Sequence, residues 1–295
     1  MISGFLNLNK PQGLTSNKAI QVLRGILKKN GLDVKVGHLG TLDPMASGVL
    51  PVAINRATRL FDYMVDKEKV YLAEFIFGAD SATLDTDSDV TFFSGVSVNE
   101  DEILSVLPSF IGEYEQIPPM FSAKSVNGVR AYDLARKGIE VELKPKKVRI
   151  YDLKLRERVG ENRYRFDIVC GGGTYIRALG RDIAAKLGTK AVMSSLIRTK
   201  SGVFDIENAL TLEQFRDKSE YLADLIVPLE TPLPRLSKII VNEEKKLFKL
   251  KNGLHVDIER TSDETENTFL YENDKLLGIS ARDNEGLLYI KTWLI

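Results

Sequence analysis

The sequence has 295 residues, and its 41 lysine and arginine residues balance its 41 aspartate and glutamate residues, so the formal net charge is zero. Nucleic-acid-binding proteins are often basic overall, so this neutral total weighs mildly against one. A single cysteine excludes an internal disulfide framework, and two histidines disfavour a zinc site. No apolar run has the length of a membrane span and the N-terminus has no signal-peptide pattern, so we expect a cytoplasmic protein with no membrane partner.

The first elements alternate between strand and helix patterns. Alternation from Ile2 to Asn9 predicts a strand, which ends in a turn at residues 10–13. Ser16 is the expected N-cap of a helix with one apolar face, and Gly31 is its expected stop. Helical spacing returns from Ala57 to Met64.

Residues 38–51 fit neither regular element, because Pro44 and Pro51 break a helix and offer no ladder donor to a central strand. They predict a shaped loop that leads into the apolar run 49–54. Asp43 is the only carboxylate in this loop, and one fixed carboxylate can act as a nucleophile or as a general base. His38 could be a base, a phosphate contact or a structural residue, and its residue type alone favours the structural role.

A strand is predicted from Val70 to Phe77, where alternate residues share a face. The segment 78–90 that follows contains four aspartates but lacks the glycine and glutamate of a calcium-binding loop, so we expect a solvated loop. Asn99 with Glu102 predicts a capped helix through Leu107.

An irregular arm spans residues 117–147, with a turn at Asn127-Gly128 and a short helical patch at 131–137. Residues 124–149 hold eight basic and three acidic side chains, a net charge of +5. Charge alone leaves two interpretations open, a solvated basic face and a nucleic-acid contact.

Paired strands are predicted at 148–159 and 163–170, and a glycine turn at 171–173 then opens a helix that stops at Gly188. Such a turn could cradle a phosphate on its backbone amides. It also places Arg177 early in the helix, where the side chain can turn back to the sheet. Taken alone, Arg177 is more simply interpreted as a surface cation.

Three prolines between Val227 and Arg235 indicate a linker. The last sixty residues predict a helix at 242–252 and a small barrel-like module with four strand-like runs, at 254–258, 269–271, 276–281 and 287–295. The final 35 residues carry seven carboxylates and three basic side chains, which is unusual for a surface that binds phosphate.

Five stretches, in order along the chain, resemble the motifs of bacterial tRNA pseudouridine-55 synthases: 9–16 (NKPQGLTS), 37–51 (GHLGTLDPMASGVLP), 69–71 (KVY), 117–124 (IPPMFSAK) and 173–177 (GTYIR). The resemblance covers nearly all of residues 3–235. It implies an α+β fold, with a central mixed, mainly antiparallel sheet flanked by helices (the pseudouridine synthase fold) and a small β-rich C-terminal PUA-like module. The expected domains are a catalytic domain at 1–235, with an RNA-gripping insertion at about 117–147, and an RNA-binding module at 236–295.

The same resemblance implies that the chain isomerises uridine 55 in the T-loop of tRNA, by flipping the base and moving its glycosidic bond from nitrogen to carbon. It implies no cofactor and no metal, with the T-arm stem-loop of tRNA as partner, and we expect a monomer. The catalytic residues implied are Asp43, which starts the reaction as nucleophile or base, Tyr71, which stacks on the uracil and assists proton removal, and Arg177, which pairs with Asp43 and would keep it ionised. The implied substrate-binding residues are His38, Leu196, Lys10, Lys124 and Arg130.

Two rival hypotheses remain. One is an RNA-folding or RNA-binding protein in which catalysis is secondary, and the other is a synthase that acts on a different uridine. Replacing Asp43 by asparagine discriminates the first, because a binding protein would tolerate the change. The acidic C-terminal module is expected to be peripheral, with an acceptor-stem contact left open.

Overall fold

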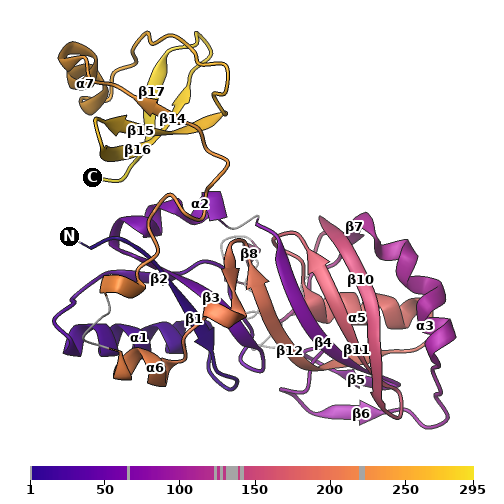
Figure 1. Cartoon of the computed structure of the whole chain (residues 1–295). Coiled ribbons are helices and arrows are strands. Elements are labelled where there is room, and N and C mark those ends of the chain that lie inside the picture. The colour runs from indigo at the N-terminus through magenta and orange to yellow at the C-terminus, as the bar shows by residue number, and fades with distance from the viewer. Residues whose placement is uncertain are drawn as a thin grey trace.

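The structure, a computed structural model, describes residues 2–64, 67–122, 125–126, 129–130, 139, 143–218 and 223–295. A central nine-stranded sheet carries helices, and a separate four-stranded sheet at the C-terminal end stands beyond one end of it (Figure 1). The predicted α+β class is confirmed. Within the described part of the chain, no helix is both long and apolar enough to cross a membrane.

The central sheet has the strand order β1-β3-β12-β4-β11-β10-β7, with β2 beside β3 and β13 beside β12. Only the β3–β12 contact is parallel, so the sheet is mixed and mainly antiparallel, as expected. The strands are β1 (Gly4–Lys10), β2 (Val36–His38), β3 (Ser47–Ile54), β4 (Lys69–Phe77), β7 (Gly112–Gln116), β10 (Lys146–Gly160), β11 (Arg163–Cys170), β12 (Ala191–Ser201) and β13 (Phe204–Asp205).

The helices of this domain lie against the sheet, with α3 and α5 at the β10 side and α1 and α6 near β1 (Figure 1). They are α1 (Ser16–Lys29), η1 (Asn55–Leu60), α2 (Phe61–Met64), α3 (Glu100–Val106), η2 (Leu107–Phe110), α5 (Ile176–Lys186), η3 (Ile206–Asn208) and α6 (Leu212–Asp217). The predicted capping box of Asn99 and Glu102 is confirmed at α3.

The predicted N-cap of α1 is wrong by one residue. Thr15 caps the helix by accepting a hydrogen bond from the Lys18 amide, whereas Ser16 is the first helical residue. The Ser16 hydroxyl exchanges hydrogen bonds with the backbone N–H and C=O of Leu42, at 2.8 and 2.9 Å. Ser16 therefore ties the start of α1 to the Asp43 loop, and a capping pattern in the sequence cannot reveal this distant partner.

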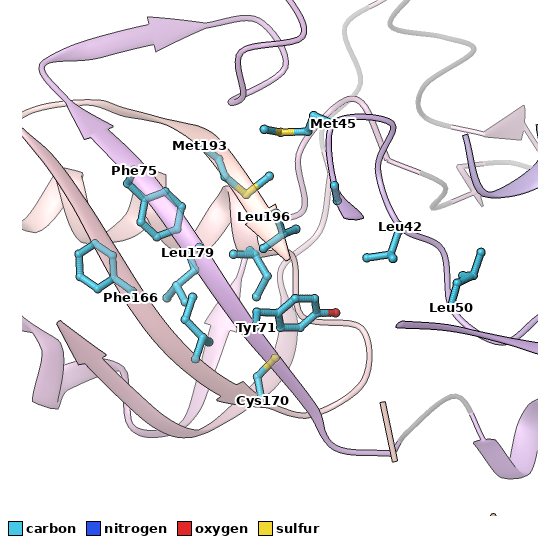
Figure 2. Packing of buried hydrophobic residues seen from close by; sticks show 14 of the residues in the cluster. Leu42, Met45, Leu50, Tyr71, Phe75, Phe166, Cys170, Leu179, Met193 and Leu196 are labelled. Atoms are coloured by element: carbon cyan, nitrogen blue, oxygen red, sulfur yellow. The ribbon is translucent and has the colours of Figure 1, made fainter. Parts of the chain in front are cut away.

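One part of the apolar core lies between α5 and the face of β4 and β11 that this helix covers. The strand predicted at 70–77 is confirmed as part of β4, whose residues from Ala73 to Phe77 are all buried. Phe75 packs against Phe166 of β11 with ring centroids 5.4 Å apart. Figure 2 shows this row of side chains running from Phe75 and Phe166 to Tyr71 and Cys170. The row is continuous, so burial of the core also fixes the position of Tyr71.

The exclusion of a strand at Pro51 is wrong, because this proline lies inside β3 opposite Asn7. The Asn7 carbonyl accepts a hydrogen bond from the Leu210 amide, so it does not need a donor from Pro51. The Pro51 carbonyl accepts from Leu39, at the point where β2 has just ended. The missing N–H therefore falls where no ladder bond is required.

The solvated loop predicted at 78–90 is also wrong. The strand β5 (Ala79–Ser81) at the start of the segment pairs with β6 (Val90–Phe92) at its end, and Asp85 between them is buried. Arm residues 131–137, where a helical patch was predicted, lie outside the described residues. The arm contributes the short hairpin of β8 (Ser125–Val126) and β9 (Val129–Arg130).

The C-terminal segment forms a four-stranded sheet in the order β14-β15-β16-β17, with one helix, α7 (Glu244–Lys251). The strands are β14 (Lys238–Ile240), β15 (Asn267–Glu272), β16 (Lys275–Arg282) and β17 (Leu288–Trp293). The strand predicted at 254–258 is reduced to one bridge between Val256 and Leu288, and β14 was not predicted.

Candidate active site

The loop between β2 and β3 carries Asp43 across one end of the central sheet. Gly40 and Gly48 on either side of it adopt φ values of +115° and +103°, which side chains with a Cβ rarely adopt. The Leu39 amide donates to the Pro51 carbonyl at 2.9 Å and closes the base of the loop. The Asp43 side chain is about one-third exposed, with a relative accessibility of 31%. The loop therefore presents one carboxylate that a substrate can reach.

Arg177 binds this carboxylate through two nitrogens. Its Nη2 donates to Oδ1 of Asp43 at 3.0 Å, and its Nε lies 3.0 Å from Oδ2. The side chain reaches the loop from the first turn of α5, after the turn in which Gly173 has a φ of +79°. Arg177 is buried, so its interpretation as a surface cation is wrong. A bidentate pair fixes the plane of the carboxylate as well as its position.

A second carboxylate, on Asp85, also faces Arg177 and was missed in the sequence. Its Oδ2 lies 3.5 Å from Nη1 of Arg177, which also donates to the Thr83 carbonyl at 2.8 Å. The other carboxylate oxygen of Asp85 accepts from the Thr83 hydroxyl and the Asp87 amide. Four aspartates in one short segment were visible in the sequence, but only the fold shows which of them is buried beside Arg177.

Burial raises the pKa of the Asp43 carboxyl above its ordinary value. The Arg177 guanidinium opposes this rise, and the negative charge of Asp85 adds to it. Burial and Asp85 therefore increase the basicity of Asp43, while the paired Arg177 guanidinium favours its charged form. Both features suit a group that attacks an atom or accepts a proton.

Tyr71 and Leu196 form an apolar wall beside the loop. Tyr71 lies on β4, and Leu196 lies on β12 opposite Ala73, which is two residues from Tyr71 along β4. In Figure 2 the Tyr71 hydroxyl points away from Phe75 and Phe166, toward the side of Leu42. Burial raises the pKa of the Tyr71 phenol, with Arg198 opposing the rise, so the group is a neutral hydroxyl near pH 7.

Lys10 lies beneath the loop and is fully buried. Its Nζ donates to the carbonyls of Pro11 and Leu14 at 2.8 and 2.7 Å, and more weakly to that of Pro44 at 3.4 Å. Burial lowers the pKa of Lys10 to about 8, although Asp43 and Asp87 counteract part of the effect. Contact with the residue after Asp43 fits the supporting role that was expected.

His38 ends β2, at the start of the loop. Its Nδ1 is buried without a hydrogen-bond partner among the described residues. Burial lowers the pKa of the ring, and the nearby Arg198 charge lowers it further, so His38 is neutral at pH 7. An unpaired buried nitrogen is unusual for a purely structural histidine.

The two candidate residues of the arm are not brought to the site by the described structure. Lys124 lies outside the described residues, and Arg130 is described only by its place in β9, which pairs with β8. Their contacts with a substrate stay predictions.

Comparison with known proteins gives consistent results along the chain. The model of the N-terminal domain of TruB family pseudouridylate synthase matches residues 24–176, and that of the tRNA pseudouridylate synthase B C-terminal domain matches residues 177–234. A protein named tRNA pseudouridine synthase B from Clostridium kluyveri is 40% identical over 297 residues, covering 99% of this chain and 100% of that protein. One of the same name from Caulobacter vibrioides is 40% identical, covering 85% of this chain and 80% of that protein.

Solved structures share the fold. A chain from the crystal structure of a Cbf5-Nop10-Gar1 complex superposes with a TM-score of 0.72 at 25% identity, covering 99% of this chain and 85% of that one. A chain of an H/ACA RNP bound to a substrate RNA containing 2'-deoxyuridine superposes with a TM-score of 0.69 at 24% identity, with the same coverage.

Proposed function

The chain belongs to the TruB family of pseudouridylate synthases, and from this membership we propose that it converts uridine 55 in the T-loop of tRNA to pseudouridine. The observation that carries the proposal is the bidentate pair of Asp43 and Arg177, with Asp43 close enough to Tyr71 for its charge to raise the pKa of the phenol. It supplies a fixed, reachable carboxylate next to an aromatic ring and an apolar wall. A nucleobase extruded from its stack needs such a surface to receive it.

The reaction is an isomerisation, so its atoms balance without a co-reactant. The bond from the sugar C1′ to N1 of uracil breaks, and a bond from C1′ to C5 forms. C5 loses its proton, and N1 gains one. Asp43 starts the reaction as a nucleophile or as a base on the sugar, while Arg177 stabilises its charge. Tyr71 stacks on the base and, as a neutral phenol, takes part in a proton relay at C5.

The remaining roles follow from position and charge. Lys10 supports the loop, and His38 and Leu196 contact the extruded base. Residues 1–235 act as the catalytic domain and 236–295 as a peripheral RNA-binding module. Lys124 and Arg130 on the basic arm bind phosphates of the T-arm, since such contacts fix the register of an RNA on its protein. One copy of the chain acts on one tRNA.

The test is tritium release from a T-arm stem-loop labelled at C5 of the target uridine. We expect Asp43→Asn to lower the release rate by at least about 100-fold, because the group that starts the reaction is lost. Its affinity for the RNA should stay within about threefold of that of the wild type. Asp33→Asn removes an exposed carboxylate, on a side chain that is 67% exposed, and should change neither quantity.

RNA binding by the wild type without tritium release from any tRNA would contradict the proposal and favour an RNA-folding role. Release from another position of full-length tRNA would contradict only the assignment of uridine 55.

A further inference from the structure

Arg198 is a charged side chain at the centre of the protein. It lies on β12 and is only 1% exposed, which makes it one of the largest fully buried side chains among the described residues. Its guanidinium donates to backbone carbonyls, at 2.7 Å to Val49 and 3.0 Å to Gly40. Burying a cation against carbonyl dipoles is costly. Proteins tend to retain such features at functional sites.

The two carbonyls belong to the two ends of the Asp43 loop. Gly40 precedes Asp43, and Val49 follows it at the start of β3. A guanidinium that binds both carbonyls therefore ties the two ends of the loop together, while Arg177 holds the carboxylate between them.

The backbone at Gly48 lies close to the backbone of Arg198. A Cβ at Gly48 would lie 2.3 Å from the Arg198 carbonyl oxygen, and one at Gly40 would lie 3.6 Å from Arg198 Nη1. Both glycines have φ values that favour glycine. The parallel register pairs Arg198 with Gly48 directly. A side chain at Gly48 would therefore clash with the Arg198 backbone, whereas the distance at Gly40 is an ordinary contact.

The other edge of β12 places Arg198 beside the second catalytic candidate. Arg198 and Tyr71 are direct partners in the antiparallel pairing of β12 and β4. One residue therefore contacts the Asp43 loop on one side and the strand of Tyr71 on the other.

We propose that Arg198 is a positioning residue that sets Asp43 relative to Tyr71 by tying both ends of the Asp43 loop to β12. The inference rests on the proposed function for its effect on rate, but its effect on the loop is independent of the reaction. Arg198 acts through groups of the protein, the Asp43 loop and the Tyr71 phenol, to which its side chain is also hydrogen-bonded. Its loss should therefore lower the chemical rate and leave RNA affinity unchanged.

The experiment compares Arg198→Met, which keeps the side-chain length, with Arg198→Lys, which keeps the charge and one donor group. Arg165→Met is the matched control, since Arg165 lies in the same sheet but pairs with Glu74 and Glu157. Single-turnover rate and dissociation constant are measured with the T-arm stem-loop. Hydrogen exchange is measured for the amides of residues 39–50 and of β4.

We expect Arg198→Met to lower the single-turnover rate about 100-fold, the size of effect that a misplacement of about 1 Å produces. The dissociation constant should change less than about threefold, because the groups that contact RNA remain. Exchange should accelerate at residues 39–50 and not in β4. Arg198→Lys should recover part of the rate, and Arg165→Met should match the wild type.

Three results would overturn the proposal. One is a folded Arg198→Met protein with a rate within threefold of the wild type. Another is faster exchange across the whole sheet with equal losses of rate and affinity, which indicates a general structural role. The third concerns the case in which Arg198→Met does not fold. A normal rate and normal hydrogen exchange of the loop in Arg198→Lys would then overturn the proposal. If the wild type itself isomerises no RNA, the proposed function fails. Faster hydrogen exchange confined to residues 39–50 in Arg198→Met would still show that Arg198 holds the loop.

Discussion

Arg177 is the residue at which the charges of the site meet. It binds Asp43 through two nitrogens and faces Asp85 with Nη1. The two carboxylates share one cation, so the protonation of Asp43 depends on a residue that the substrate need not touch. Asp85 therefore tunes the pKa of Asp43, and this role can be measured separately from the chemical step.

Asp85→Asn should move the acid limb of the pH profile of kcat/KM to lower pH. The negative charge of Asp85 raises the pKa of Asp43, and its removal makes the charged form of Asp43 easier to reach. We expect a shift of about 0.5–1 pH unit, a size ordinary for one nearby charge. The pH dependence of kcat/KM on the stem-loop, which reports the free enzyme, measures it.

Asp89→Asn serves as control, because this aspartate lies exposed in the same segment and should leave the limb in place. A limb that moves to higher pH in Asp85→Asn would show that Asp85 acts on Asp43 chiefly by holding Arg177 in position.

Single residues show where sequence reasoning stops. The motif around Asp43 was recognisable because its residues are contiguous, and the resemblance carried Arg177 with it. Taken by itself, Arg177 was predicted to be a surface cation, because its two carboxylate partners, Asp43 and Asp85, are far from it in the sequence. Asp85 and Arg198 were missed for the same reason, because their significance arises only from partners that the fold brings together.

The position of helix α5 depends on one glycine. Gly180 faces β4, and a Cβ there would lie 2.4 Å from the ring of Phe75. Gly180 follows Arg177 by three residues, nearly one turn. The close approach of helix and sheet therefore sets how far Arg177 reaches toward Asp43.

Gly180→Ala should push α5 away from the sheet. We expect it to lower the free energy of unfolding by about 1–3 kcal/mol, which is the usual cost of overpacking. It should also slow tritium release, because Arg177 moves with the helix. Gly25→Ala is a matched control in α1, because a Cβ there meets nothing within 4 Å. It should raise stability by about 0.5–1 kcal/mol through the better helix propensity of alanine. Urea denaturation measures both changes, and a Gly180→Ala protein as stable and active as the wild type would show that the helix position is not critical.

Elements with a clear period were predictable from the sequence. The strand predicted at 70–77, the hairpin of β10 and β11 and the capped helix α3 follow from local patterns, and all three are confirmed. Pro51 was misplaced because the rule against proline in a strand depends on which neighbour needs its donor, and only the pairing with Asn7 reveals that. The β5–β6 hairpin was missed because its strands have three residues each, too few for a period to appear.

At the scale of the whole molecule, the two sheets are joined by contacts that no local pattern foretells. The guanidinium of Arg56 donates to the Leu294 carbonyl at 3.1 Å, and that of Arg59 donates to the Trp293 carbonyl at 2.7 Å. Tyr63 and Thr292 share a hydrogen bond of 3.0 Å between their hydroxyls. A buried apolar cluster runs across the same boundary, from Phe5, Leu39 and Val49 to Phe269, Ile279 and Leu294. The C-terminal module is therefore docked on the side of the sheet where the Asp43 loop begins.

This docking predicts that the module adds stability to the catalytic domain without entering the chemistry. The double variant Arg56→Met, Tyr63→Phe removes two hydrogen bonds across the boundary and should weaken docking by about 1–3 kcal/mol. Because the apolar cluster remains, the module should stay folded but detach from the catalytic domain more often. Proteolysis between residues 227 and 237 should therefore accelerate. Tritium release from the stem-loop should change less than about twofold. Arg24→Met, on the exposed face of α1, should alter neither. Unchanged proteolysis would show that the apolar cluster alone holds the module, whereas a large loss of release would show that docking shapes the Asp43 loop.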